Sequence, residues 1–147
     1  MSTLINFSPS DNNLTGVLAG SNANVGKLLI ITGQSGGVLQ FTPISDLSAP
    51  TRQLPMFYLE GKLYTGGNAV VGDTIRVAYK GIIADLSYSS MPTVGDYVYR
   101  GSGGILSLTA WGTVTIRLGR VLSVDSGRGV YTCWFDSTFA WDTLTGG

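Results

Sequence analysis

The side chains that most often carry catalysis are nearly absent from this chain. None of its 147 residues is a histidine, so it cannot assemble a Ser-His-Asp or Cys-His nucleophile or supply an imidazole metal ligand. Its one cysteine, Cys133, lies in the apolar run 130–135, which is typical of a small buried side chain. A single cysteine also excludes an internal disulfide and a cysteine-rich zinc site.

Carboxylates are the next side chains to consider. Asp73 and Asp96 each follow a Val-Gly pair, and Glu60 is the single glutamate. Neither aspartate has the dense spacing of oxygen ligands that a calcium loop needs, and no two carboxylates have a spacing that indicates glycosidase-type acid–base chemistry. We therefore expect both aspartates to cap backbone N–H groups of their own turns. The sequence predicts no enzymatic activity, no metal and no cofactor.

Two glycine-rich segments resemble nucleotide-binding loops but fail on spacing. Residues 20–27 end in Gly-Lys, yet five residues rather than four separate the two glycines, and Leu28 stands where a phosphate loop needs Ser or Thr. Residues 33–36 resemble half of a dinucleotide fingerprint, but no strand–helix–strand pattern surrounds them. We interpret both segments as turns.

Charge and hydropathy exclude two classes of partner. Nine basic and nine acidic residues give a formal net charge of zero, without the clustered cations that nucleic-acid binding requires. No apolar run approaches the length that spans a bilayer, and the first residues lack the pattern of a signal peptide. We therefore expect neither a nucleic-acid nor a membrane partner.

The elements that would position these residues are strands. Residues 74–80 and 113–118 alternate apolar and polar side chains, the period of a strand with one face in a core. No window has the apolar stripe of a helix, and residues 125–129 have the composition of a hairpin turn. The pattern predicts an all-β fold, a compact β-barrel or sandwich domain over residues 25–147. Further short strands are expected at 28–31, 56–59, 82–86, 97–99, 120–124 and 130–135.

A degenerate repeat runs through the predicted domain. Val-Gly followed by Lys or Asp opens a strand at residues 25, 71 and 94, and glycine turns follow the strands. At least one of Gly101, Gly103 and Gly104 is expected to need a positive φ to reverse the chain. The openers are unequally spaced, which favours a compact domain over a solenoid.

Two segments are candidate contact surfaces. Residues 1–24 consist of turn chemistry apart from Leu4, Ile5 and Phe7, and we interpret them as an extended arm whose apolar residues dock on this domain or on a partner. A frayed terminus is the alternative. Residues 43–55 carry three prolines, so they predict a long loop over a neighbouring molecule. Its candidate contact residues are Ile44, Leu47, Arg52 and Leu54.

The three tryptophans could also act as stacking platforms. Trp134 is expected in the core, whereas Trp141 lies beyond the last strand and is a candidate for an oligomer interface. Arg117 and Arg120 are the only cations placed among the aromatic residues.

The order of short motifs from residue 71 to 135 resembles the capsid decoration (cement) proteins of tailed bacteriophages. A Gly-Asp-x-Val-Tyr strand occurs at residues 95–99, followed by the glycine turn 101–104, an arginine- and glycine-containing strand at 117–122 and a closing strand at 129–135. The closing strand departs from the Val-Arg-Val that is frequent in the family. The resemblance implies a barrel or tulip-like β domain, no catalysis, and oligomers on the outside of a capsid that contact it through an N-terminal extension and loops.

These observations predict a virion structural protein, made in the host cytoplasm, that binds the capsid exterior and stabilises it. Its expected partners are the major capsid protein, which the arm residues Leu4, Ile5 and Phe7 are expected to contact, and further copies of itself, in a trimer by family resemblance or else a dimer. A phage tail, baseplate or fibre component has the same composition and stays open. A carbohydrate- or oligonucleotide-binding β-barrel is the alternative from another class.

Overall fold

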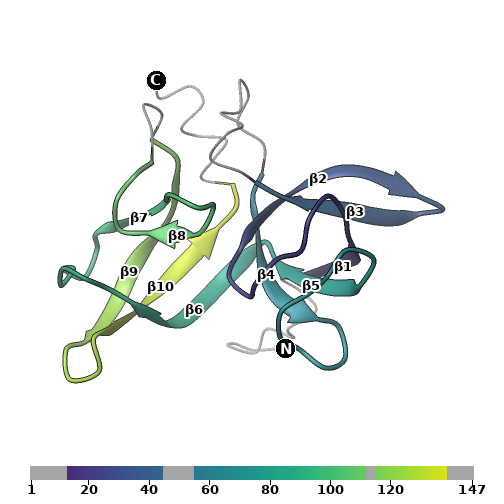
Figure 1. Ribbon diagram of the computed structural model, residues 1–147. Coiled ribbons are helices and arrows are strands. Elements are labelled where there is room, and N and C mark those ends of the chain that lie inside the picture. The colour runs from purple at the N-terminus through teal and green to yellow at the C-terminus, as the bar shows by residue number, and fades with distance from the viewer. Residues whose placement is uncertain (1–12, 45–54, 112–114, 139–147) are drawn as a thin grey trace, which may run out of the picture.

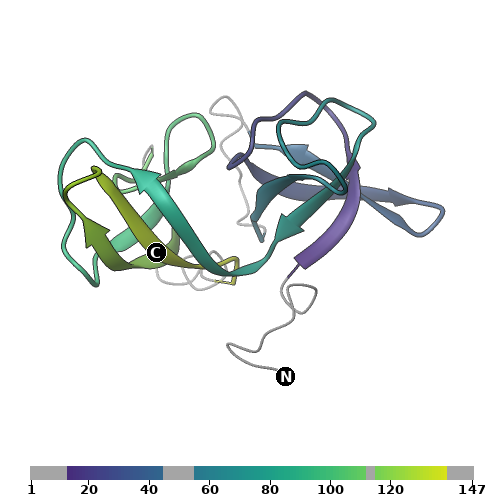
Figure 2. The ribbon, with the colours of Figure 1, turned by 90° about the horizontal axis from the view of Figure 1, so that it is seen from below.

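The computed structural model describes residues 13–44, 55–111 and 115–138, and these form ten strands and no helix. The predicted all-β fold is confirmed. The strands make two lobes that lie side by side (Figures 1 and 2), the barrel lobe and the sheet lobe. The barrel lobe contains β1 (Asn13–Leu18), β2 (Leu28–Ser35), β3 (Val38–Pro43), β4 (Phe57–Lys62) and β5 (Thr74–Ala78). The sheet lobe contains β6 (Lys80–Ser87), β7 (Tyr97–Arg100), β8 (Leu106–Ser107), β9 (Arg117–Asp125) and β10 (Val130–Asp136).

The first five strands close into a barrel in the order β1-β3-β2-β4-β5. Strand β1 completes the circle, because it pairs in parallel with β3 and antiparallel with β5. The alternation in β5 is the expected one, with Ile75 and Val77 fully buried and Arg76 on the other face. The buried residues of this core are Leu18, Ala23, Leu29, Phe41, Phe57, Leu59, Ala69, Ile75 and Val77.

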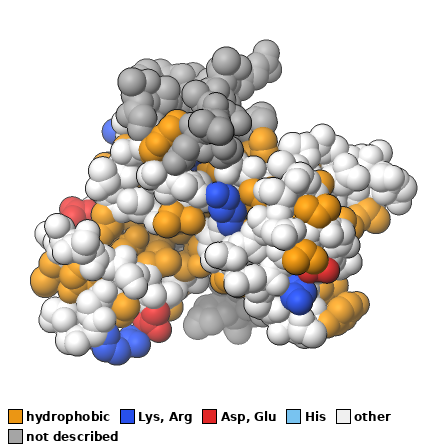
Figure 3. Space-filling model, in the orientation of Figure 1, with side chains coloured by type: hydrophobic (Ala, Val, Ile, Leu, Met, Phe, Trp, Pro, Cys, Tyr) orange, Lys and Arg blue, Asp and Glu red, His pale blue; other side chains and the backbone are white. Residues whose placement is uncertain are grey.

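The second five strands form a sheet in the order β6-β10-β9-β7-β8. Along β10 the side chains alternate strictly, with Tyr131, Cys133 and Phe135 buried and their neighbours partly exposed. These three residues face a second core, and Figure 3 shows further apolar side chains gathered over this lobe. Partly buried residues of the sheet lobe that pack on this core are Ile83, Leu86, Tyr88, Leu108 and Val124.

A β-bulge in β6 is fixed by the tip of the β9–β10 hairpin. Between the pairs Leu86–Tyr131 and Ile83–Cys133, strand β6 has one residue more than β10, and Asp85 adopts a φ of 61° there. Aspartate tolerates this left-handed conformation better than most residues. The Arg128 guanidinium lies 2.9 Å from Asp85 and 2.8 Å from Asp125, and it lowers the pKa of Asp125 by hydrogen bonding.

The two lobes share one of the two cores. Only Tyr79 separates β5 from β6, so no linker lies between the lobes. Leu28 and Met56 are fully buried in the core of the sheet lobe although the chain around them belongs to the barrel lobe. The Leu28 N–H also donates to the Gly104 carbonyl at 2.8 Å. The single β domain expected for residues 25–147 is therefore two lobes packed as one unit.

The extended arm expected for residues 1–24 is wrong in its second half. Asn13–Leu18 form a barrel strand, Leu18 is fully buried, and Ala23 bridges to Ala69. The sequence signal failed here because this strand has no strict alternation, and its pairing partners lie far away in the chain. Residues 1–12 lie outside the described residues.

Candidate interaction surfaces

Of the predicted contact residues, the structure describes one. Ile44 packs on the core of the sheet lobe, and its N–H donates to the Leu28 carbonyl at 3.1 Å. The structure thus gives the partly buried Ile44 an intramolecular contact at the junction of the lobes, and its contact with a partner stays a prediction. The remaining predicted contact residues lie outside the described residues: Leu4, Ile5, Phe7, Leu47, Arg52, Leu54 and Trp141.

The predicted capping by aspartates is confirmed. The Asp73 carboxylate accepts a hydrogen bond from the Val70 N–H at 2.9 Å, and the Asp96 carboxylate accepts one from the Thr93 N–H at 2.9 Å. These two carboxylates serve equivalent turns, one in each lobe. Within the part of the chain that the structure describes, no group of three or more His, Cys, Asp or Glu side chains could hold a metal ion.

Cys133 is a core side chain, as expected. It is fully buried between Tyr131 and Phe135 on the inner face of β10. Burial raises the pKa of its thiol to about 12, because the apolar surroundings disfavour the thiolate. The reactive form of the side chain is therefore suppressed at neutral pH.

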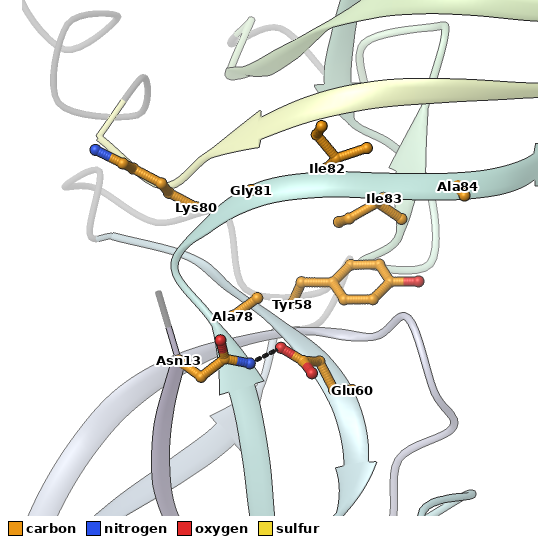
Figure 4. A pocket seen from close by; sticks show the side chains of 9 residues that line it. All are labelled: Asn13, Tyr58, Glu60, Ala78, Lys80, Gly81, Ile82, Ile83 and Ala84. Carbon is orange, nitrogen blue, oxygen red and sulfur yellow. Dashed lines mark hydrogen bonds between the residues drawn. The ribbon is translucent and has the colours of Figure 1, made fainter. Parts of the chain in front are cut away.

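A pocket of about 370 Å³, the junction pocket, opens where the two lobes meet. Figure 4 shows Glu60 and Asn13 on its barrel side, joined by a hydrogen bond that the Asn13 amide donates, and the Tyr58 ring alongside Ile83. Burial raises the pKa of Glu60, while Arg76 and the Asn13 hydrogen bond act in the opposite direction. The residues that line the pocket are Asn13, Tyr58, Glu60, Ala78, Lys80, Gly81, Ile82, Ile83 and Ala84.

Glu60→Gln should increase the free energy of unfolding at pH 7. The pKa of Glu60 is higher in the folded protein than its ordinary value of 4.5, so protonation of Glu60 stabilises the fold. This stabilisation is complete below pH 4.5 and is lost as the pH rises through the pKa that Glu60 has in the folded protein. The difference between variant and parent should therefore vanish in thermal melts below about pH 4. Lower stability of the variant at pH 7 would show that the bonds of Glu60 to its neighbours outweigh its burial.

A second pocket, of about 300 Å³, lies between the 22–27 segment and the glycine tip, which we define as residues 101–104. The Lys27 ammonium donates to the Gly103 carbonyl, so it already has a partner across the lobe junction. Strand β2 begins at Leu28, and Gly20 and Gly26 have φ values of 82° and 95°. These residues form turns, as expected, and no helix follows to cradle a phosphate.

The glycine tip is built as predicted for a chain reversal, since Gly103 and Gly104 have φ values of 78° and 70°. A Cβ on Gly103 would meet open space, whereas one on Gly104 would lie 2.9 Å from the Ile44 carbonyl oxygen. Gly103→Ala should cost about 1 kcal/mol of stability from backbone strain, and Gly104→Ala should cost more because it also presses on the lobe junction. Urea unfolding of both variants measures the difference, and equal losses would exclude a packing role for Gly104.

The outer face of the sheet lobe carries aromatic and cationic side chains in register. Tyr97 on β7 pairs with Arg120 on β9, which pairs with Trp134 on β10, which pairs with Ile82 on β6. Directly paired residues of antiparallel strands point to the same face, so these four form one row. The expectation that Trp134 lies in the core is wrong, because Trp134 alternates with the three buried residues of β10 and lies half-buried on the opposite face.

Arg117 joins this row because of a second bulge. Gly119 pairs with Val98 and Arg117 pairs with Tyr99, so Leu118 is an extra residue in β9. On a regular strand, two side chains that are three residues apart point to opposite faces. The extra residue Leu118 shifts this alternation, so Arg117 and Arg120 point to the same face of the sheet. The two guanidinium carbons lie 4.8 Å and 4.2 Å from the centre of the Tyr97 ring, within cation–π range.

Trp111, the other described candidate platform, is used inside the molecule. The guanidinium of Arg100, which is buried, lies 4.2 Å from the centre of its ring. Arg100 also donates to the Gly101 carbonyl at 3.1 Å. This stack supports the base of the glycine tip.

Comparison of the chain with protein-family models and with curated protein sequences gives no match. No helix in the described ranges is long and apolar enough to cross a membrane.

Proposed function

We propose that this chain is a structural protein of a tailed-phage particle, which binds the outside of the capsid and stabilises it. The observation that carries the proposal is the ordered set of motifs from residue 71 to 135, because each motif has a defined task in the fold. Asp96 caps the turn before β7, the glycine tip reverses the chain after it, and β9 and β10 complete the sheet. A resemblance that rests on turn-forming glycines is stronger when those glycines make the turns.

The way the lobes are joined supports a stabilising role. A protein that holds capsid subunits together must transmit load between its contact points without bending. Here Leu28 and Met56 of the barrel lobe are buried in the core of the sheet lobe, and a single residue connects β5 to β6. Hinge motion about this junction would expose buried apolar side chains to water, and the free-energy cost of that exposure opposes the motion.

Attachment is assigned to the segments before β1, between β3 and β4, and after β10. Leu4, Ile5 and Phe7 precede β1, and we propose that they add to an edge or groove of the major capsid protein. Trp141 and the loop residues Leu47, Arg52 and Leu54 are assigned to contacts with the capsid or with further copies of the chain, in a trimer or dimer.

The direct test is the location and copy number of the protein. Intact particles from the virus that encodes the chain should carry it at a copy number comparable with that of the coat protein, and immunogold should label the shell. Particles stripped of the protein should regain it when it is added back, and should then resist heating better. Gold confined to the tail would replace the proposal with a tail or baseplate component, and absence from purified particles would overturn it.

A further inference from the structure

We propose that the outer face of the sheet lobe, formed by Ile82, Tyr97, Arg117, Arg120 and Trp134, binds an acidic segment of a protein partner. The inference deepens the proposed function, on which it rests for the identity of the partner: the segment belongs to the capsid protein. The face points away from the shared core, since Trp134 alternates with the buried residues of β10, and Ile82 and Arg120 pair directly with Trp134.

The charge of the face selects the partner. Arg117 and Arg120 are both exposed, and the ion pairs among the described residues involve Arg128 only. Asp136, two residues after Trp134 on the same face of β10, pairs with Lys80, and its carboxylate accepts from the Thr138 N–H and hydroxyl at 2.9 Å and 2.6 Å. Two guanidiniums that form no ion pair with a described carboxylate are complementary to carboxylates on another chain.

The Arg120 side chain is held ready for such a contact. It donates to the Tyr97 hydroxyl at 2.7 Å and to the Gly95 carbonyl at 3.2 Å. A guanidinium has five N–H donors, so these two bonds fix its plane and leave donors for a ligand. Fixing a side chain before binding lowers the entropy that association costs.

Apolar side chains next to the arginines indicate a protein rather than a nucleic acid. Ile82 is 66% exposed and pairs directly with the half-buried Trp134. Tryptophan, tyrosine and arginine, packed beside apolar residues, are the side chains that dominate binding energy in protein interfaces. Two arginines on a chain with zero net charge are too few to follow a phosphate backbone.

The test uses the full chain with Trp111→Phe and Trp141→Phe, so that fluorescence reports on Trp134 alone. The probe is a synthetic peptide with two aspartates beside a leucine and a phenylalanine, and a matched peptide with asparagines controls for charge. We expect saturable binding of the acidic peptide only, weakening with added salt. Arg117→Gln with Arg120→Gln should weaken it about tenfold or more, whereas Lys62→Gln with Arg76→Gln, which removes the same charge from the barrel lobe, should change it less than about twofold.

Three outcomes would overturn the inference: no saturable binding of the acidic peptide, equal binding of the asparagine peptide, or equal effects of the two double variants. Tighter binding of a dT12 oligonucleotide than of the peptide would also overturn it, in favour of a nucleic-acid platform. The add-back assay separates the two proposals. Normal particle binding by the Arg117→Gln, Arg120→Gln variant contradicts this inference and leaves the capsid function standing, while failure of the parent chain to bind particles contradicts the capsid function.

Discussion

Deletion of residues 2–24 should abolish cooperative unfolding of the protein. The deletion removes β1, which pairs over five residues with β5 and closes the barrel against β3. It also removes the fully buried Leu18, whose N–H donates to the Asp73 carbonyl at 3.0 Å. The loss of one strand from a closed barrel leaves two unpaired edges and an open core. We expect the resulting loss of folding free energy to exceed the roughly 5 kcal/mol that stabilises many small domains.

Deletion of residues 2–12 is the matched control, because it leaves every described residue in place. This shorter variant should keep the thermal transition of the parent, measured by circular dichroism, and lose attachment to particles. If the longer deletion also melts like the parent, β1 does not contribute to the stability of the barrel. If the shorter deletion binds particles normally, the role assigned to Leu4, Ile5 and Phe7 is wrong.

Gly119→Ala should be the most damaging single substitution in the sheet lobe. A Cβ at this position would overlap the Trp134 carbonyl oxygen and lie 2.9 Å from its carbonyl carbon. Both atoms belong to the backbone of β10, so no side-chain rotation can relieve the overlap. The strands must separate at the centre of the sheet, and we expect a loss of about 3 kcal/mol or more in urea unfolding.

Gly127→Ala provides the comparison within the same hairpin. Its Cβ would have its nearest contact at 3.5 Å, with the Asp125 carboxylate. We expect a change within about 0.5 kcal/mol, as for most surface substitutions. Equal stability of the two alanine variants would show that β9 and β10 are not packed as closely as the structure has them.

The sequence is informative where a strand has one buried face. Alternation in β5 and the apolar run of β10 predict their strands, and Val-Gly-Asp predicts the capped turns at Asp73 and Asp96. Strand β1 gives no such signal. Gly16 in its middle weakens the pattern, yet a Cβ there would lie 2.5 Å from the Leu39 carbonyl oxygen. The glycine is explained only by β3, more than twenty residues away.

The outer face of the sheet lobe could be predicted only in part. Alternation along β10 places Trp134 opposite Cys133, so a buried Cys133 already indicates an outward Trp134. The shared face of Arg117 and Arg120 could not be predicted, because it depends on the extra residue Leu118 in β9. A bulge changes the period locally without a distinctive residue type at that site.

The shared core also sets an order of folding during synthesis. All five strands of the barrel lobe have left the exit tunnel once Ala78 is free, so the barrel can close, with β1 meeting β5, before the strands of the sheet lobe emerge. The sheet lobe has no such independence, because its core is incomplete without Leu28 and Met56. The finished barrel is therefore expected to act as a template on which the later strands condense, and a nascent chain released from the exit tunnel only as far as Ala78 would hold a folded barrel with Leu28 and Met56 exposed.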